Sequence, residues 1–311
     1  MKKPQFTFPR RDVHGLILLD KPIGLSSNQA LQKVRNLFKA EKAGHTGALD
    51  PLATGVLPIC LGEATKVAGH LLGNDKAYEV TARLGASTDT DDSEGQVLLE
   101  RTIGEYPRAQ LESILQGFIG NIQQVPPIYS ALKQGGEPMY LKARRGENIE
   151  LPARPISIHS IEVLAQTDDS FRLSVVCGSG TYIRSLVRDI GESLGCGAHV
   201  SALRRTWVEP FQATHLWTWQ ELQDIAALGQ DALDAQLIPV EQALVAIPRL
   251  VLDATQVRRV GMGQKIHITG MNEAHDLIQL CDENDRALGL ASINAEGVLK
   301  LQRLFRWAAI S

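Results

Sequence analysis

Residues 44–66 read GHTGALDPLATGVLPICLGEATK, a stretch that joins a turn-forming segment to an apolar one. Glycines at positions 44, 47 and 55 bracket His45 and Asp50, and glycine allows sharp turns and the close approach of a ligand. Pro51 favours an extended backbone at Asp50. A rigid loop that presents one carboxylate is what covalent catalysis by aspartate requires. An ordinary Asp-Pro turn beside a packed histidine fits the same residues, so the loop leaves both interpretations open.

The segments around this loop predict alternating strands and helices. Residues 15–20, GLILLD, have the continuous apolar pattern of a short buried strand, which the sequence KPIG ends. Ser26 or Ser27 can cap a following helix whose apolar residues share one face. Residues 78–84 alternate between apolar and polar side chains, so they predict a half-buried strand with Tyr78 on its apolar side.

A strand, a turn and a helix are predicted again further along the chain. Residues 107–118 predict a helix and residues 171–177 a strand. The turn Gly-Ser-Gly then leads into a helix over about 181–194, with Tyr182 and Arg184 in its first turn. This turn lacks the third glycine of a dinucleotide fingerprint, and the chain has no Walker A sequence, so no nucleotide cofactor is expected.

Two polar segments interrupt these patterns. Residues 89–95 are acidic but lack the ligand spacing of a calcium loop, and they predict a solvated turn between strands. Residues 126–154 are rich in turn-forming residues and mix lysines and arginines with tyrosines. This composition suits backbone contacts and base stacking on a nucleic acid, and a mobile surface loop is the alternative.

Charge is unevenly distributed over the 311 residues, although the net charge is only −3. That sum mildly disfavours a nucleic-acid partner. Residues 1–42, however, hold nine basic and three acidic side chains, while residues 206–249, predicted to be helical, hold six acidic and one basic. A near-neutral total can therefore hide a basic face, although two ordinary solvated surfaces explain the same distribution. After Arg249, short apolar stretches between polar turns predict a small β-rich domain.

Cysteine spacing and hydropathy favour a cytoplasmic protein. The four cysteines form no C-x-x-C pair, so neither a zinc site nor a disulfide framework is expected. No stretch reaches the roughly 18 consecutive apolar residues of a membrane span, and the N-terminus lacks the apolar run of a signal peptide.

Five motifs in order carry a resemblance to a known family. The stretch 44–66 closely resembles the catalytic signature of the bacterial tRNA pseudouridine-55 synthases of the TruB type. Residues 15–27, the sequence KAY at 76–78, GSGTYIRSL at 178–186 and ALRR at 202–205 resemble the remaining motifs of that family. The C-terminal region is more loosely similar to the family's PUA-type RNA-binding appendage.

This resemblance implies an α+β fold, the pseudouridine synthase fold, with a mixed, mainly antiparallel central sheet flanked by helices. It implies a catalytic domain over residues 1–249, with an RNA-binding insertion at about 126–154, and a small β-rich PUA-like domain over residues 250–311. The implied partner is transfer RNA, bound at its T-arm stem-loop by a monomeric enzyme that uses no cofactor and no metal.

The implied reaction converts uridine 55 of transfer RNA into pseudouridine. The N1–C1′ bond breaks, the uracil rotates, and C5 joins C1′, so substrate and product are isomers. By resemblance Asp50 is the nucleophile and Arg184 its charge partner, and attack on the base, attack on the sugar and a glycal-type route remain open. The resemblance assigns substrate contacts to His45, Tyr78, Tyr182, Leu203 and Lys21. Candidate contacts to the RNA backbone are Lys142, Arg144, Arg145, Arg204 and Arg205.

A uridine inside a folded T-loop has to leave its stack before a carboxylate can reach it. Tyr78 would then stack on the flipped base, which is typically worth ~1–3 kcal/mol. One alternative is a non-catalytic RNA-binding or RNA-folding protein, which would not need a carboxylate that phosphates repel. A carboxylate glycosidase would need two acids across the sugar bond, and no second acid stands out near a motif.

Overall fold

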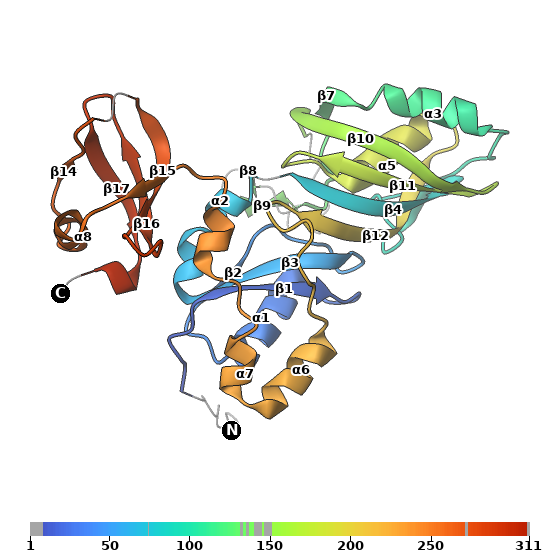
Figure 1. Cartoon of the computed structure of the whole chain (residues 1–311). Helices are drawn as coiled ribbons and strands as arrows, with labels where there is room; N and C mark the ends of the chain where they lie inside the picture. The colour runs from blue at the N-terminus through green and yellow to red at the C-terminus, as the bar shows by residue number, and fades with distance from the viewer. Residues whose placement is uncertain are drawn as a thin grey trace.

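The chain is described by a computed structural model over residues 9–73, 75–130, 133–134, 137–139, 145, 151–270 and 273–309. Its main sheet has eight strands in the order β1-β3-β12-β4-β11-β10-β7, and β2 pairs with β3 beside this path (Figure 1). Only β12 and β3 run parallel, so the sheet is mixed and mainly antiparallel, which confirms the predicted fold class. The strands are β1 Gly15–Lys21, β2 Ala43–His45, β3 Thr54–Leu61, β4 Lys76–Leu84, β7 Gly120–Gln124, β10 Arg154–Gln166, β11 Ser170–Cys177 and β12 Ala198–Val208.

Helices cover the sheet at both of its ends (Figure 1). Helices α1, α6 and α7 lie near β1–β3, whereas α3 and α5 lie near β10–β12. Two further sheets, β5–β6 and β8–β9, have two strands each. The bounds are α1 Ser27–Leu37, η1 Gly62–Lys66, α2 Ala68–Leu71, β5 Ala86–Thr88, β6 Val97–Glu100, α3 Arg108–Gln116, β8 Lys133–Gln134, β9 Glu137–Pro138, α5 Ile183–Ser193, α6 Trp219–Leu228, α7 Gln230–Asp234 and η2 Val240–Leu244.

Strand β1 is buried on both faces, which explains its continuous apolar sequence. Ile17 and Leu19 pack into the main core under the helices, while Leu16 and Leu18 pack into a second cluster on the opposite face. A strand with one solvated face would alternate instead. In β4, Tyr78 lies with the buried apolar side chains, as its alternation predicts.

Helix starts follow capping chemistry. Ser26 caps α1, and its hydroxyl and the Gln29 side chain form a reciprocal capping box. Helix α5 begins at Ile183, two residues later than the sequence predicts, because Gly180 has φ +83° and Tyr182 is extended at the N-cap. Arg184 therefore lies in the first turn of the helix, whereas Tyr182 precedes it.

A second sheet of five strands, in the order β13-β15-β16-β17-β14, forms the C-terminal unit, seen apart from the main sheet in Figure 1. A cluster that joins Leu16 and Leu18 of β1 to Leu290 and Phe305 connects this unit to the rest of the protein. Its elements are β13 Arg249–Val251, α8 Ala254–Gly261, β14 Ile266–His267, β15 His275–Cys281, β16 Ala287–Ile293, β17 Val298–Leu304 and η3 Arg306–Ala308. In the part of the chain that the structure describes, no helix is both long and apolar enough to cross a membrane.

Candidate active site

Asp50 lies on the loop between β2 and β3, and the loop is held on each side of it. On one side the Ser27 hydroxyl accepts from the Leu49 amide at 2.7 Å and donates to the Leu49 carbonyl at 2.9 Å. On the other side the carbonyl of Pro51 accepts from the Gly24 amide at 2.8 Å and from the Lys21 ammonium at 3.4 Å. Both anchors come from the motif at residues 15–27, so this motif fixes the backbone that carries Asp50.

Gly55 lets the Asp50 loop enter the sheet beside β12. A Cβ atom at this position would lie 2.1 Å from the carbonyl oxygen of Arg205, and the φ of Gly55 is +96°. Any other residue would push β3 away from β12 at their parallel contact. The glycine is therefore required by a close approach of two backbones.

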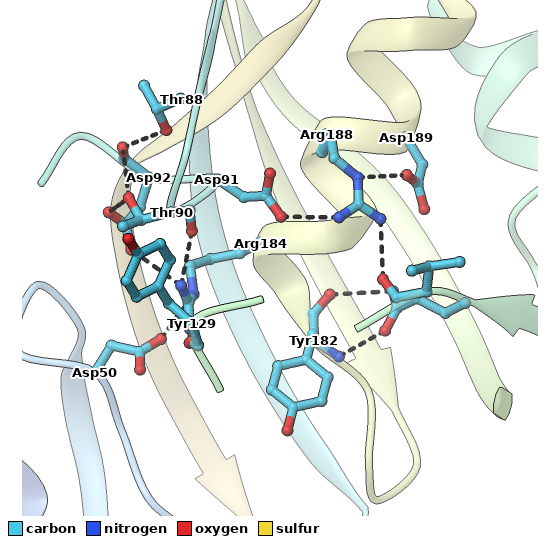
Figure 2. Close-up of polar contacts among 12 residues, drawn as sticks. Asp50, Thr88, Thr90, Asp91, Asp92, Tyr129, Tyr182, Arg184, Arg188 and Asp189 are labelled. Atoms are coloured by element: carbon cyan, nitrogen blue, oxygen red, sulfur yellow. Dashed lines mark hydrogen bonds and ion pairs between the residues drawn. The ribbon is translucent and has the colours of Figure 1, made fainter. Parts of the chain in front are cut away.

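Arg184 points at Asp50 and uses its whole guanidinium group (Figure 2). Its Nε lies 2.9 Å from Oδ2 of Asp50, and its Nη1 donates to the Thr90 carbonyl at 2.7 Å. Nη1 also lies 3.5 Å from Oδ2 of Asp92, and Nη2 donates to the Tyr129 carbonyl at 3.0 Å. The arginine side chain is only 6% exposed, whereas that of Asp50 is 42% exposed and open to a substrate.

The acidic turn at residues 89–95 lies between strands β5 and β6, as predicted, but the prediction that it is solvated is wrong for its two central aspartates. Asp91 and Asp92 are both buried. Oδ1 of Asp92 accepts from the Thr90 hydroxyl at 2.6 Å and from the Glu94 amide at 3.0 Å, while Oδ2 faces Arg184. Sequence reasoning missed Asp92 because its partner lies far away in the chain; a dense acidic turn without calcium-loop spacing was the available signal.

Burial and neighbouring charges act on the pKa of Asp50 in opposite directions. Burial raises the pKa above the ordinary value for aspartate, the charge of Arg184 lowers it, and the charge of Asp92 raises it further. Burial dominates, so the pKa of Asp50 remains raised. Arg184 is therefore the main group that favours the ionised carboxylate.

Asp50 and Arg184 line a cavity of about 820 Å³ together with most of the predicted substrate contacts. Tyr78 from β4, Leu203 from β12, and His45 and Tyr182 border the same space. Burial raises the pKa of the Tyr78 phenol, so this group stays protonated at neutral pH. Aromatic rings and a carboxylate thus share one cavity whose size suits a nucleotide-sized ligand.

His45 and Lys21 differ in how they serve the site. Nδ1 of His45 is buried and has no hydrogen-bond partner among the described residues, and burial followed by the charge of Arg205 lowers the pKa of this histidine. Lys21 is fully buried below the loop, where its ammonium donates to the carbonyls of Pro22 and Leu25 at 2.9 and 2.7 Å. Burial lowers the pKa of Lys21 to about 8. Lys21 therefore supports the loop and does not border the cavity.

The two arginines at the end of the ALRR motif have different environments. Arg204 is partly exposed and forms a bidentate pair with Asp20 at 2.9 and 2.8 Å. Arg205 is 1% exposed, and it donates to the carbonyls of Val56 and Gly47 at 2.8 and 3.2 Å. Arg205 lines the cavity, but a role in binding RNA phosphates does not fit its position, because the side chain is buried and its guanidinium donates to the loop backbone.

The predicted backbone contacts Lys142 and Arg144 lie outside the described residues, while Arg145 is exposed. Within the described ranges, no group of three or more histidine, cysteine, aspartate or glutamate side chains could hold a metal ion. All four cysteines are free and buried.

Solved structures with this fold define the class of protein. The chain superimposes on a chain of the "Crystal Structure of a Cbf5-Nop10-Gar1 Complex" with a TM-score of 0.76 and 26% identity, covering 100% of this chain and 94% of that chain. A chain of the "Structure of H/ACA RNP bound to a substrate RNA containing 2'-deoxyuridine" matches with a TM-score of 0.74 and 25% identity, covering 98% and 91%. The fold is that of the pseudouridine synthases.

Sequence comparison narrows this class to one family. The model of the TruB family pseudouridylate synthase N-terminal domain matches residues 35–183, and two TruB C-terminal domain models match residues 184–245 and 248–305. The chain is 52% identical to the tRNA pseudouridine synthase B of Xanthomonas campestris pv. campestris (strain B100), over 97% of each chain. It is 48% identical to that of Xylella fastidiosa (strain Temecula1 / ATCC 700964), over 95% of this chain and 97% of the relative. This chain belongs to the TruB family.

Proposed function

We propose that this protein isomerises uridine 55 in the T-loop of transfer RNA to pseudouridine, with Asp50 as the reacting carboxylate. The observation that carries the proposal is the ion pair between Asp50 and Arg184 at the edge of a cavity lined by Tyr78 and Tyr182. The names of the relatives favour transfer RNA as the substrate.

The chain's own residues supply three requirements of this reaction. Arg184 orients the carboxylate of Asp50 and favours its ionised form. The buried Tyr78 offers a flat apolar surface for the uracil ring, and Leu203 lines the same cavity. No oxidant or energy source is needed, because the proton lost at C5 is balanced by one gained at N1.

The uridine has to leave the T-loop stack to enter the cavity, which costs a few kcal/mol that contacts with the protein must offset. In this proposal His45, which lines the cavity, lies against the RNA at the space that the flipped base leaves. Burial lowers the pKa of His45, so its ring is neutral at neutral pH and can lie against the RNA without introducing a charge.

The proposal includes the domain boundaries. Residues 1–249 form the catalytic domain and residues 250–311 a PUA-like RNA-binding domain, supported by the separate five-stranded sheet that begins at β13. The segment at about 126–154 contacts the RNA backbone, and it enters the site through Tyr129, whose carbonyl accepts from Arg184.

Release of tritium from transfer RNA labelled at uridine C5 tests the proposal, with the wild-type protein and Asp50→Asn compared directly. We expect the wild-type protein to release tritium in repeated turnovers and D50N to release none above background, because the amide cannot act as a nucleophile. A D50N variant that turns over at the wild-type rate would exclude the mechanism.

The same experiment separates the enzyme from a non-catalytic RNA-binding protein. Wild-type protein that binds the labelled RNA tightly but leaves it unchanged would support an RNA-binding or RNA-folding function. Binding of D50N at wild-type affinity would show that the substitution leaves the fold and the RNA-binding surface intact.

A further inference from the structure

Two arginines one helical turn apart on α5 face two successive aspartates of the acidic turn. Arg184 meets Asp92, and the Nη1 of Arg188 lies 2.9 Å from Oδ2 of Asp91 (Figure 2). Like charges four residues apart on a helix repel each other, so the two aspartates offset a repulsion within α5. Among the described residues, those that line the cavity include neither Arg188 nor Asp91, so this second pair has no direct part in the site.

Asp91 combines burial with an unfavourable backbone conformation. Its φ is +60°, in the left-handed region that disfavours residues with a side chain, although aspartate and asparagine less than most. The backbone is fixed there because the Asp91 amide donates to the Thr88 carbonyl at 3.3 Å and the Val200 amide donates to the Asp91 carbonyl at 3.0 Å. Burial also raises the pKa of Asp91 to about 6, against the opposing charges of Arg188 and Arg184. Stability alone does not favour a strained, buried carboxylate, and such residues concentrate at functional sites.

Arg188 also holds the start of the predicted RNA-binding insertion. Its Nη2 donates to the Val125 carbonyl at 2.9 Å. The neighbouring Gln124 is buried. Its side-chain Nε2 donates to the Tyr182 carbonyl at 3.1 Å, and its Oε1 accepts from the Tyr182 backbone amide at 2.9 Å. Four residues after Val125, the Tyr129 carbonyl accepts from Arg184. Residues 124–129, which we call the root of the insertion, are therefore held at three points, by Tyr182, Arg184 and Arg188.

We infer that Arg188, through its pair with Asp91, is a positioning residue. It holds the acidic turn and the root of the insertion in the positions in which both contact Arg184. This inference rests on the proposed function. Thr90 and Asp92, the direct neighbours of Asp91, are partners of Arg184, and so is Tyr129 from the insertion root. Loss of the Arg188 contacts frees both segments, so Arg184 no longer holds Asp50 in one orientation.

A positioning role predicts a loss in the chemical step with little change in RNA affinity. We expect Arg188→Gln and Asp91→Asn to lower the single-turnover rate of pseudouridine formation roughly tenfold, since small misplacements of reacting groups have effects of this size or larger. The dissociation constant for transfer RNA should stay within about twofold, because contacts with the RNA are retained. Asparagine tolerates the left-handed conformation, so D91N removes the charge and keeps the backbone.

Two further variants define the role of the charge pair. Arg188→Lys keeps a cation opposite Asp91, and we expect it to recover most of the rate that R188Q loses. The double variant D91N/R188Q should be no slower than the slower single variant, because both changes break the same interaction.

Arg101→Gln is the matched control. Nη1 of Arg101 lies 2.7 Å from Oε2 of Glu192, so this variant removes a more exposed arginine–carboxylate pair from the C-terminal end of the same helix. We expect R101Q to keep the wild-type rate, because this pair contacts neither the acidic turn nor residues 124–129.

Two results would overturn the inference. Rates of R188Q, R188K and D91N equal to the wild-type rate, together with lower melting temperatures, would make the pair purely structural. Weaker RNA binding with an unchanged single-turnover rate would instead make Arg188 an RNA-binding residue. If R188Q fails to fold, the rates of D91N and R188K decide in its place. An inactive wild-type protein would contradict the proposed function itself, whereas an active wild-type protein with unaffected variants would contradict only this inference.

Discussion

Asp50 and Arg184 show how the charge state of one residue depends on another. Burial raises the pKa of Asp50, and the charge of Arg184 opposes that effect. The arginine is itself held by the carbonyls of Thr90 and Tyr129 and by Asp92, so it cannot turn away from Asp50 without losing these partners. The buried acidic turn thus acts on Asp50 in two ways: it holds Arg184 in place, and the charge of Asp92 raises the pKa of Asp50.

Removal of this cation should change the pH dependence of the reaction. Asp50 has to be ionised, and its pKa is already raised, so activity falls as pH decreases through that raised pKa. In Arg184→Gln the opposing charge is lost and the pKa rises further. We therefore expect Arg184→Gln to have a lower maximal rate than the wild-type protein. In a profile of kcat/KM measured between about pH 5 and 8, its acidic limb should lie at higher pH. Arg184→Lys should shift the limb less, and identical limbs in all three proteins would contradict this role of the charge.

Among the elements of the fold, the insertion at about 126–154 is the one to which the proposed function assigns contacts with the RNA backbone. Its root is fixed by α5, whereas the predicted contacts Lys142 and Arg144 lie outside the described residues. Binding by such side chains releases counterions from the RNA, so it depends on salt.

Replacement of Lys142, Arg144 and Arg145 by alanine should weaken transfer RNA binding and flatten its salt dependence. The slope of log Kd against log salt should fall by about 0.7–0.9 for each phosphate contact that is lost. Binding isotherms at several salt concentrations measure this slope. A triple alanine variant at Arg83, Arg108 and Arg172, which do not line the cavity, is the charge-matched control. Equal slopes for the two triple variants would remove the insertion from the interface.

At the scale of the whole molecule, Glu63 connects the main sheet to the C-terminal unit. Its side chain is almost fully buried, and its Oε2 accepts from the Lys66 ammonium at 2.5 Å and from the Arg306 amide at 2.6 Å. The Lys66 ammonium also donates to the Leu304 carbonyl at 2.6 Å. Burial would raise the pKa of Glu63, but these hydrogen bonds outweigh it and lower the pKa.

Glu63→Gln should therefore destabilise the protein in a pH-dependent way. The lowered pKa of Glu63 means that its contribution is present at neutral pH and is lost as pH falls through that pKa. We expect a loss of about 1–3 kcal/mol in the free energy of unfolding at neutral pH, which shrinks at acidic pH. Urea unfolding at two pH values measures it, with the exposed Glu100→Gln as control. A pH-independent difference would contradict the assignment.

Local patterns predicted the elements around the site well. The continuous apolar run of β1 and the alternation of β4 each report burial of a strand, and this information lies within a few residues. The start of α5 was harder to predict, because the extended backbone at Tyr182 depends on its bonds to Gln124 in another strand.

The sequence by itself was enough to predict the buried strand β1, the half-buried strand β4 and the loop that carries Asp50, because apolar periodicity and turn residues are local properties. The order of its motifs carried the resemblance to the TruB family, and that resemblance implied the mixed sheet. Which charged side chains are buried, and which of them form ion pairs, could be seen only in the folded structure. Arg204 and Arg205 are neighbours, yet one is partly exposed and the other is buried against the loop. Asp92 looked solvated and is a partner of Arg184. Burial and ion pairing arise from segments that are distant in the chain, and folding alone brings these segments together.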